Sequence, residues 1–287
     1  MGGASAVIGG DAPVPYPDRA VLVDGHVHLH DCFDLRIFLD SAAANFRRAA
    51  AEIGAAGDAP GCLCFVDHGP RSAFRALRAR AGAEVCEGWT VRALEEESSV
   101  CLTRADGARL LVLAGQQIRT RDGLEVLALA TGERFRDGRA LEETVDQVLG
   151  AGAIAVVPWG FGKWWLNRGR RVARLLERAP AGLFLGDNAG RPERAWRPRL
   201  FDLAAERGVY VLPGTDPLPF RRSAVLPGRY GFVLRGELDS ERPAEGLTRI
   251  LLAMRAQPPI FGRRASVLRF LFDQSMMNLQ KRVGGAT

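Results

Sequence analysis

Lysine is almost absent from this chain. Lys163 and Lys281 are the only two, so arginine carries nearly all of the positive side of a net charge of +6. The planar guanidinium suits phosphate and carboxylate groups, but the arginines alternate with acidic residues along the expected helices. Because the sequence has no continuous basic and aromatic stripe, its composition argues against nucleic acid as the main partner.

Long apolar runs are missing too. No segment approaches the roughly 20 apolar residues that cross a bilayer, so we expect no transmembrane segment. Residues 1–18 are rich in Gly, Ala and Pro and lack the basic start and apolar run of a secretion signal, which predicts a flexible tail on a cytoplasmic protein. The five cysteines form no CxxC pair, as is typical of free thiols in a reducing compartment.

Histidine is equally scarce, and three of the four histidines fall in the segment DGHVHLH that begins at Asp24. Alternate side chains of a strand share one face, so Asp24, His26, His28 and His30 are expected to point the same way. The apolar residues VLV come just before them, which predicts a buried strand that ends in a polar site. Neutral imidazoles beside carboxylates are good ligands for zinc, manganese or iron, so this segment predicts a metal site.

Helix-like and strand-like segments alternate through most of the chain, which indicates parallel strands joined by crossover helices. Polar residues recur where the expected strands end: His26/His28, Asp67/His68, Gln116/Gln117, Pro158/Trp159, Asp187/Asn188 and Asp216. Residues that converge from many strand ends are typical of the C-terminal rim of a β/α barrel. The glycine-rich first turn of a doubly wound sheet is absent.

We therefore expect an α/β protein whose residues 19–240 form a distorted, TIM-like β/α barrel. The barrel would have seven or eight mainly parallel strands and an inserted β-hairpin, because Asp-Gly pairs at 106–107 and 122–123 are strong hairpin signals. Residues 241–287 are expected to form a helical extension packed on the barrel. Its amphipathic pattern leaves open two alternatives, a homo-oligomer joined through these helices and contact with a membrane surface.

Four segments, in this order, resemble the polymerase and histidinol phosphatase (PHP) family of metal-dependent phosphoesterases. DGHVHLH resembles the family's opening HxH motif, and FVDHGP resembles its second motif. LAGQQIRTRDGLEVLAL resembles the strand that supplies a metal-bridging glutamate, and VLPGTD resembles the closing GSDxH motif. The resemblance covers about residues 20–220 and implies a distorted β/α barrel with up to three metals at the strand ends.

The resemblance implies that His26 and His28 bind one metal and that Asp216 completes its ligand set. It also implies that His68, together with Asp34, belongs to a neighbouring metal. Two histidines and one aspartate are the ligand set of an open catalytic zinc-type site, in which one position is left for water.

Three ligand positions of the family are substituted in this sequence. Gln117 stands where the bridging glutamate is expected, and Pro158 and Leu218 stand where the family has histidines. Glutamine can coordinate through its carbonyl oxygen but brings no negative charge, and proline and leucine cannot coordinate. We therefore expect a reduced centre that holds one divalent metal (Zn, Mn or Fe) per chain, with Gln117 as a neutral ligand.

Together these features predict a metal-dependent hydrolase, a phosphoesterase that acts on a small phosphorylated metabolite. A metal at such a site lowers the pKa of a bound water to near neutrality. The expected catalytic residues are Asp67, His68 and Asp216, of which Asp67 or His68 would orient the leaving group or carry the proton. Phosphate oxygens need cationic partners. The candidates that follow strand ends are Lys163, Arg168 and Arg191.

Two alternative functions stay open. An amide or lactone hydrolase of the amidohydrolase type would share the HxH motif and the strand-end aspartate, although such barrels add histidines on later strands and none follows His68. A catalytically inactive barrel that binds a ligand or partner would explain the substituted ligand positions. The retained histidines argue against it, because converging polar groups in a core are costly.

Overall fold

The computed structural model describes residues 20–55, 61–69 and 71–284, so the expected tail at 1–18 lies outside the described residues. The strands are β1 (Ala20–Val27), β2 (Gly61–Phe65), β3 (Glu84–Cys86), β4 (Trp89–Ala93), β5 (Ser99–Arg104), β6 (Arg109–Leu113), β7 (Gly115–Arg119), β8 (Glu125–Leu129), β9 (Ile154–Pro158), β10 (Leu183–Asn188), β11 (Val211–Gly214), β12 (Tyr230–Arg235) and β13 (Ile260–Gly262). The helices are α1 (Leu35–Glu52), α2 (Ala73–Arg78), α3 (Leu141–Gly150), α4 (Asn167–Arg178), α5 (Arg199–Glu206), α6 (Pro243–Leu252), α7 (Val267–Gly284) and the 3-10 helix η1 (Arg221–Val225).

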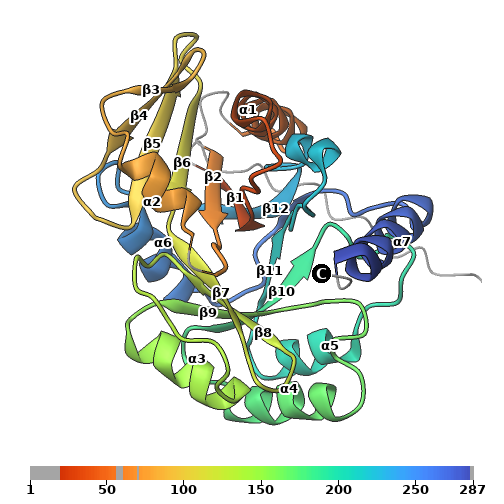
Figure 1. Cartoon of the computed structure of the whole chain (residues 1–287). Coiled ribbons are helices and arrows are strands. Elements are labelled where there is room, and N and C mark those ends of the chain that lie inside the picture. Colours follow the sequence, from red (N-terminus) through yellow and green to blue (C-terminus); the bar gives the residue numbers. More distant parts are fainter. Residues whose placement is uncertain (1–19, 56–60, 70, 285–287) are drawn as a thin grey trace, which may run out of the picture.

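The strands form two mixed sheets. The larger has the order β13-β12-β1-β2-β6-β5-β4-β3, and the smaller has the order β11-β10-β9-β8-β7. Among the described strands, seven of eleven pairings are antiparallel. The expectation of a closed, TIM-like barrel of mainly parallel strands is therefore wrong: the protein is a two-sheet α/β structure (Figure 1).

Most pairings follow the connections; the exception is β8 and β9, which are antiparallel although α3 lies between them. A helix separates β1 from β2, β9 from β10 and β10 from β11, and each of these pairs is parallel. The chain runs from β3 to β8 without a helix in between, and only short antiparallel connections fit such segments. Both predicted hairpins are confirmed, since β5 pairs with β6 and β7 pairs with β8, and Gly107 and Gly123 have positive φ in the turns.

The two sheets meet at two seams, and these seams position the polar strand ends. At one, the Asp216 amide donates to the His26 carbonyl (2.8 Å). At the other, the Gln117 amide donates to the Asp67 carbonyl (2.9 Å). Gly214 makes the first seam possible, because a Cβ there would lie 2.3 Å from the backbone nitrogen of His26. The C-terminal ends of β1, β2 and β11 are thus brought together beside the middle of β7.

Helices cover the outer sides of both sheets. In Figure 1, α3, α4 and α5 lie along one face of the smaller sheet, and α1 packs on the larger one. The side chains that α3 and α4 bury include Leu141 and Val145 of α3 and Leu175 and Leu176 of α4. Near the C-terminus, α7 contacts the rest of the chain through an aromatic pair between Phe270 and Phe161, whose ring centroids are 5.2 Å apart.

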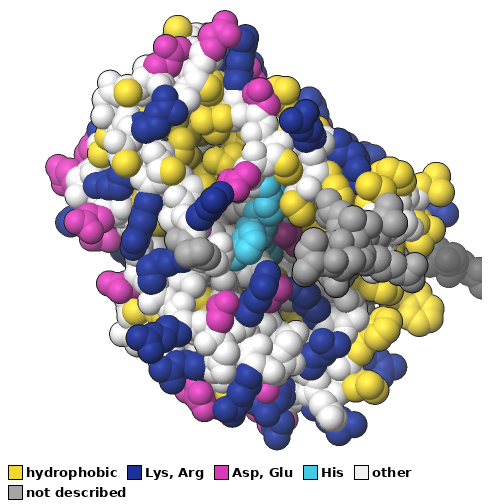
Figure 2. All heavy atoms as spheres, viewed as in Figure 1, with side chains coloured by type: hydrophobic (Ala, Val, Ile, Leu, Met, Phe, Trp, Pro, Cys, Tyr) yellow, Lys and Arg dark blue, Asp and Glu magenta, His cyan; other side chains and the backbone are white. Residues whose placement is uncertain are grey.

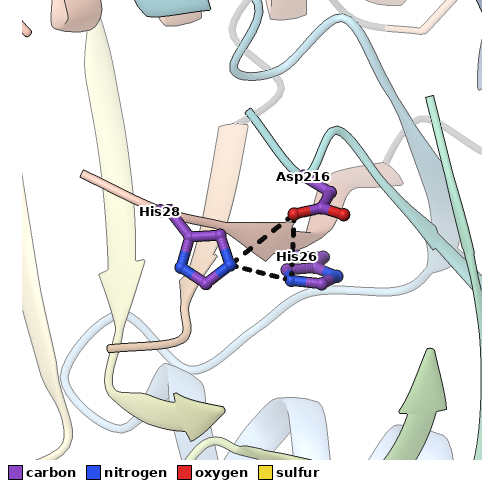
Figure 3. Close-up of side chains that lie close together, drawn as sticks. All are labelled: His26, His28 and Asp216. Carbon is purple, nitrogen blue, oxygen red and sulfur yellow. Dashed lines mark hydrogen bonds and ion pairs between the residues drawn. The ribbon is translucent and has the colours of Figure 1, made fainter. Parts of the chain in front are cut away.

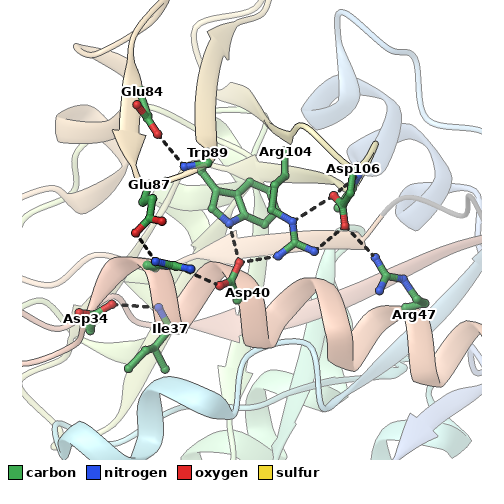
Figure 4. A network of polar contacts seen from close by, with 12 residues as sticks. Asp34, Ile37, Asp40, Arg47, Glu84, Glu87, Trp89, Arg104 and Asp106 are labelled. Carbon is green, nitrogen blue, oxygen red and sulfur yellow. Dashed lines mark hydrogen bonds and ion pairs between the residues drawn. The ribbon is translucent and has the colours of Figure 1, made fainter.

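A polar network joins α1 to the antiparallel strands β4 and β5 (Figure 4). The carboxylate of Asp40 accepts hydrogen bonds from the Trp89 indole (2.9 Å) and from the Arg104 guanidinium (2.5 Å). Arg104 also forms a two-pronged ion pair with Asp106 (3.0 and 2.7 Å). Because Trp89 is fully buried, this network fixes the register between the helix and the strands.

Candidate metal centre

His26, His28 and Asp216 converge at the first seam (Figure 3). His26 lies in β1, His28 lies two residues further along the chain, just past the end of β1, and Asp216 follows β11. The two Nε2 atoms are 3.0 Å apart, and Oδ1 of Asp216 lies 3.4 Å from Nε2 of His26 and 3.6 Å from Nε2 of His28. This is the one such group of possible metal ligands within the part of the chain that the structure describes.

These separations fit a shared metal ion. Ligand atoms at the usual 2.0–2.2 Å from a tetrahedral zinc ion lie about 3.3–3.6 Å from one another. The three distances between donor atoms fall in or close to this range. Gln117 adds a fourth donor atom, because its Oε1 lies 3.1 Å from Nε2 of His26. The group therefore suits a divalent metal in both donor type and spacing.

The protonation states also suit metal binding. Burial and, to a lesser extent, the neighbouring His26 together lower the pKa of His28 to about 3, so the His28 imidazole is neutral near pH 7 with a free lone pair. Burial acts to raise the pKa of Asp216, but His26 and His28 outweigh it and hold this pKa below its ordinary value. A neutral imidazole and an ionised carboxylate are the forms that coordinate metals.

Asp24 ties together the two backbones that carry these donors. Its fully buried carboxylate accepts hydrogen bonds from the Thr215 amide (2.8 Å), the Thr215 hydroxyl (2.6 Å) and the Gly228 amide (2.9 Å). Burial raises the pKa of Asp24 to about 7, even though these hydrogen bonds act to lower it. Asp216, which follows Thr215 in the chain, has a φ of +47°, a left-handed conformation that is uncommon outside glycine. The contacts of Asp24 hold that turn in place.

His30 and His68 lie beside the group rather than in it. The ring of His68 lies 5.4 Å from that of His28 and 6.1 Å from that of His30 between centroids. His30 contacts the Pro217 carbonyl at 2.9 Å through Nε2. His28, His30, His68 and Arg71 line a cavity of about 670 Å³. Figure 2 shows the histidines gathered in a hollow in the middle of this face, with Lys and Arg side chains around it.

The two other predicted acidic residues are engaged by helix starts. The carboxylate of Asp67 accepts hydrogen bonds from the Ser72 hydroxyl (2.6 Å) and from the amides of Ala73 (3.1 Å) and Phe74 (3.3 Å), at the start of α2. Asp34 caps α1, because it accepts from the Ile37 amide at 2.9 Å. Neither joins the three-residue group, and the roles given to them from the sequence stay predictions.

The three predicted phosphate ligands occupy different settings. Lys163 forms an ion pair with Glu125, and its charge contributes to the low pKa of Asp216. Arg168 donates to the Gly162 carbonyl at 2.9 Å. Arg191 is buried and forms a two-pronged ion pair with Asp187 of β10. Their contact with substrate stays a prediction.

Two residues of the site were given no role from the sequence. Arg71 lines the cavity and pairs with Asp31 at 2.8 Å, and its only sequence signal is its place just after FVDHGP. Asn188 donates through Nδ2 to Oδ2 of Asp216 at 3.1 Å. The sequence marked Asn188 only as a polar strand end. At two of the three substituted positions, Pro158 ends β9 and Leu218 follows the turn at Asp216.

Comparisons with known proteins add the fold and little else. No family model and no curated protein matches the chain. PsfC from Pseudomonas syringae PB-5123 shares the fold, with a TM-score of 0.52 and 13% identity over 92% of this chain and 99% of PsfC. The lesion-specific endonuclease PfuEndoQ from Pyrococcus furiosus gives a TM-score of 0.49 at 10% identity over 84% of this chain, which spans 57% of that protein. That score is too low to support an argument. No helix in the described ranges is long and apolar enough to cross a membrane.

Proposed function

We propose that this protein is a metal-dependent hydrolase that cleaves phosphoesters of small metabolites, with one divalent metal held by His26, His28 and Asp216. The spacing of the three donor atoms carries the proposal, because it matches a shared ion. The cavity beside His28 gives a substrate a place next to that ion. The PHP resemblance supports a phosphoester as the substrate.

A divalent metal bound here would act as a Lewis acid toward a phosphoryl oxygen and increase the acidity of water. His68 is exposed on the cavity wall, 5.4 Å from His28 between ring centroids, and in this proposal it would give a proton to the leaving group. It suits this role better than Asp67, whose carboxylate already accepts three hydrogen bonds from the start of α2. Arg71 and Lys163 would offset the charge of the phosphate.

Metal content and turnover, measured on the same samples, test the proposal. Wild-type protein loaded with Zn²⁺ or Mn²⁺ should retain about one metal per chain and hydrolyse p-nitrophenyl phosphate or a member of a phosphorylated-metabolite panel. His28→Ala should lose both properties. His68→Asn is the matched control, because it removes a neighbouring imidazole outside the group: it should keep the metal and lose turnover.

Two outcomes would contradict the proposal. Wild-type protein that retains no metal under any loading condition would remove the metal centre. Metal retention without turnover of any phosphomonoester or phosphodiester would leave the inactive, ligand-binding alternative as the better account.

A further inference from the structure

The side-chain amide of Asn188 orients the carboxylate of Asp216. Asn188, at the C-terminal end of β10, donates through Nδ2 to Oδ2 of Asp216 (3.1 Å) and to the Trp159 carbonyl (3.0 Å). The other carboxylate oxygen, Oδ1, is the one that faces His26 and His28. With both hydrogens of its amide engaged, Asn188 leaves a single oxygen of Asp216 directed toward the metal position.

A buried trio fixes Asn188 in turn. Arg191 forms two hydrogen bonds of 2.7 Å with the two carboxylate oxygens of Asp187, and Tyr230 donates to Oδ2 of Asp187 at 3.0 Å. The backbone amide of Asn188 donates to Oδ1 of Asp187 (3.0 Å), and the backbone amide of Arg191 donates to the backbone carbonyl of Asn188 (3.1 Å). Asn188 is therefore held from both sides of its own backbone.

The trio is unusual for its burial. Asp187, Arg191 and Tyr230 are 5%, 5% and 3% exposed. A buried ion pair is weak evidence for stability, because the cost of removing both charges from water offsets their attraction. With its guanidinium committed to Asp187 and closed off from solvent, Arg191 has no surface to offer a substrate. Its position, directly beside the residue that orients a metal ligand, gives the trio a role at the site.

We propose that Asn188 is a positioning residue that makes Asp216 a one-oxygen ligand, and that Arg191 acts through Asp187 to hold Asn188 instead of contacting the substrate. The inference rests on the metal centre of the proposed function. Hydrogen-bond partners of metal ligands typically contribute about 10–100-fold to metal affinity. Loss of the Asn188 amide should therefore weaken metal binding and free Oδ2 to coordinate as well.

Cobalt(II) is the probe, since its visible absorption reports the number of ligands and its affinity can be measured against a competing chelator. Asn188→Ala should bind Co²⁺ about 10–100-fold more weakly than wild type and show a weaker visible band, as a higher coordination number gives. Asn188→Leu, similar in size but without the donor, should do the same. Arg191→Lys should weaken Co²⁺ binding by a smaller factor.

Asn45→Ala is the matched control, because Asn45 is similarly buried and its amide also donates to two carbonyls, those of Val225 and Pro227. Its Co²⁺ affinity and spectrum should equal those of wild type. Equal effects of Asn45→Ala and Asn188→Ala would reduce Asn188 to a structural role and overturn the inference, as would an unchanged spectrum in both Asn188 variants.

The two proposals fail differently. If wild-type protein binds Co²⁺ and His26→Ala does not, while Asn188→Ala keeps the wild-type affinity, the metal centre stands and the positioning role falls. If wild-type protein binds no Co²⁺, both fall.

Discussion

Asp24→Ala should destabilise the metal-free protein strongly. The substitution removes the acceptor of three short hydrogen bonds, from the Thr215 amide, the Thr215 hydroxyl and the Gly228 amide, at a site with no exposure to water. A buried donor left without a partner costs about 1–3 kcal/mol, so the loss should be at least about 3 kcal/mol. Thr215→Val removes only the hydroxyl donor and should cost about 1 kcal/mol.

Urea denaturation of the metal-free variants, followed by tryptophan fluorescence, measures both losses. Thr215→Val keeps the prediction testable if Asp24→Ala does not fold, because its smaller cost leaves most of the usual stability of a domain intact. A loss below about 1 kcal/mol in Asp24→Ala would refute the reasoning. It would mean that the hydrogen bonds of Asp24 do not stabilise the junction between β1 and the segment after β11.

Three further predictions concern other parts of the molecule. Asp40→Asn should remove an acid-sensitive contribution to stability. Burial acts to raise the pKa of Asp40, but the hydrogen bonds from the Trp89 indole and from Arg104 outweigh it and lower this pKa. The contribution is therefore present above about pH 4 and lost as the pH falls, so the difference in unfolding free energy between wild type and variant should shrink at low pH. Gly231→Ala should impair folding, because a Cβ would lie 2.1 Å from the Val23 carbonyl, whereas Gly132→Ala, with nothing within 4 Å, should change stability by less than about 0.5 kcal/mol in the same denaturation assay. Chelation of the bound metal should lower the melting temperature, with a loss of about 2.7 kcal/mol at a metal concentration 100 times Kd, and an unchanged melting temperature would count against tight binding to the native state.

The centre of the site could be predicted from sequence because its signal is local. Alternation in one strand is enough to place His26 and His28 on a common face. Asp216 is far away in the chain: its place at a strand end could be predicted from the sequence, but its role as a metal ligand came only from the resemblance of VLPGTD to a family motif. Asn188 was predicted only as a polar strand end, because its contact with Asp216 depends on which carboxylate oxygen it meets, and no sequence pattern encodes that choice.

The barrel was predicted for a reason that the structure makes clear. Alternating helices and strands do give parallel pairs around β1–β2 and β9–β11. Local patterns do not say which strand lies beside a given strand, however. The antiparallel neighbour of β1 is β12, about two hundred residues later, and the run from β3 to β6 folds back on itself as a meander. Arg191 is a similar case, because its partner Asp187 is near in sequence but the burial of the pair comes from the tertiary structure.

The seam between β1 and β11 also sets when the site can exist during folding. Asp24 and Thr215 are separated by 191 positions. The two histidines beside Asp24 therefore lack their carboxylate partner until the much later segment that contains Asp216 has packed against β1. Contacts of such long range form after much of the chain has been ordered, because closing a long loop costs entropy first. A nascent or truncated chain that stops before Asp216 has only part of the ligand set. Uptake of metal would therefore report that the long-range junction between β1 and the segment after β11 is complete.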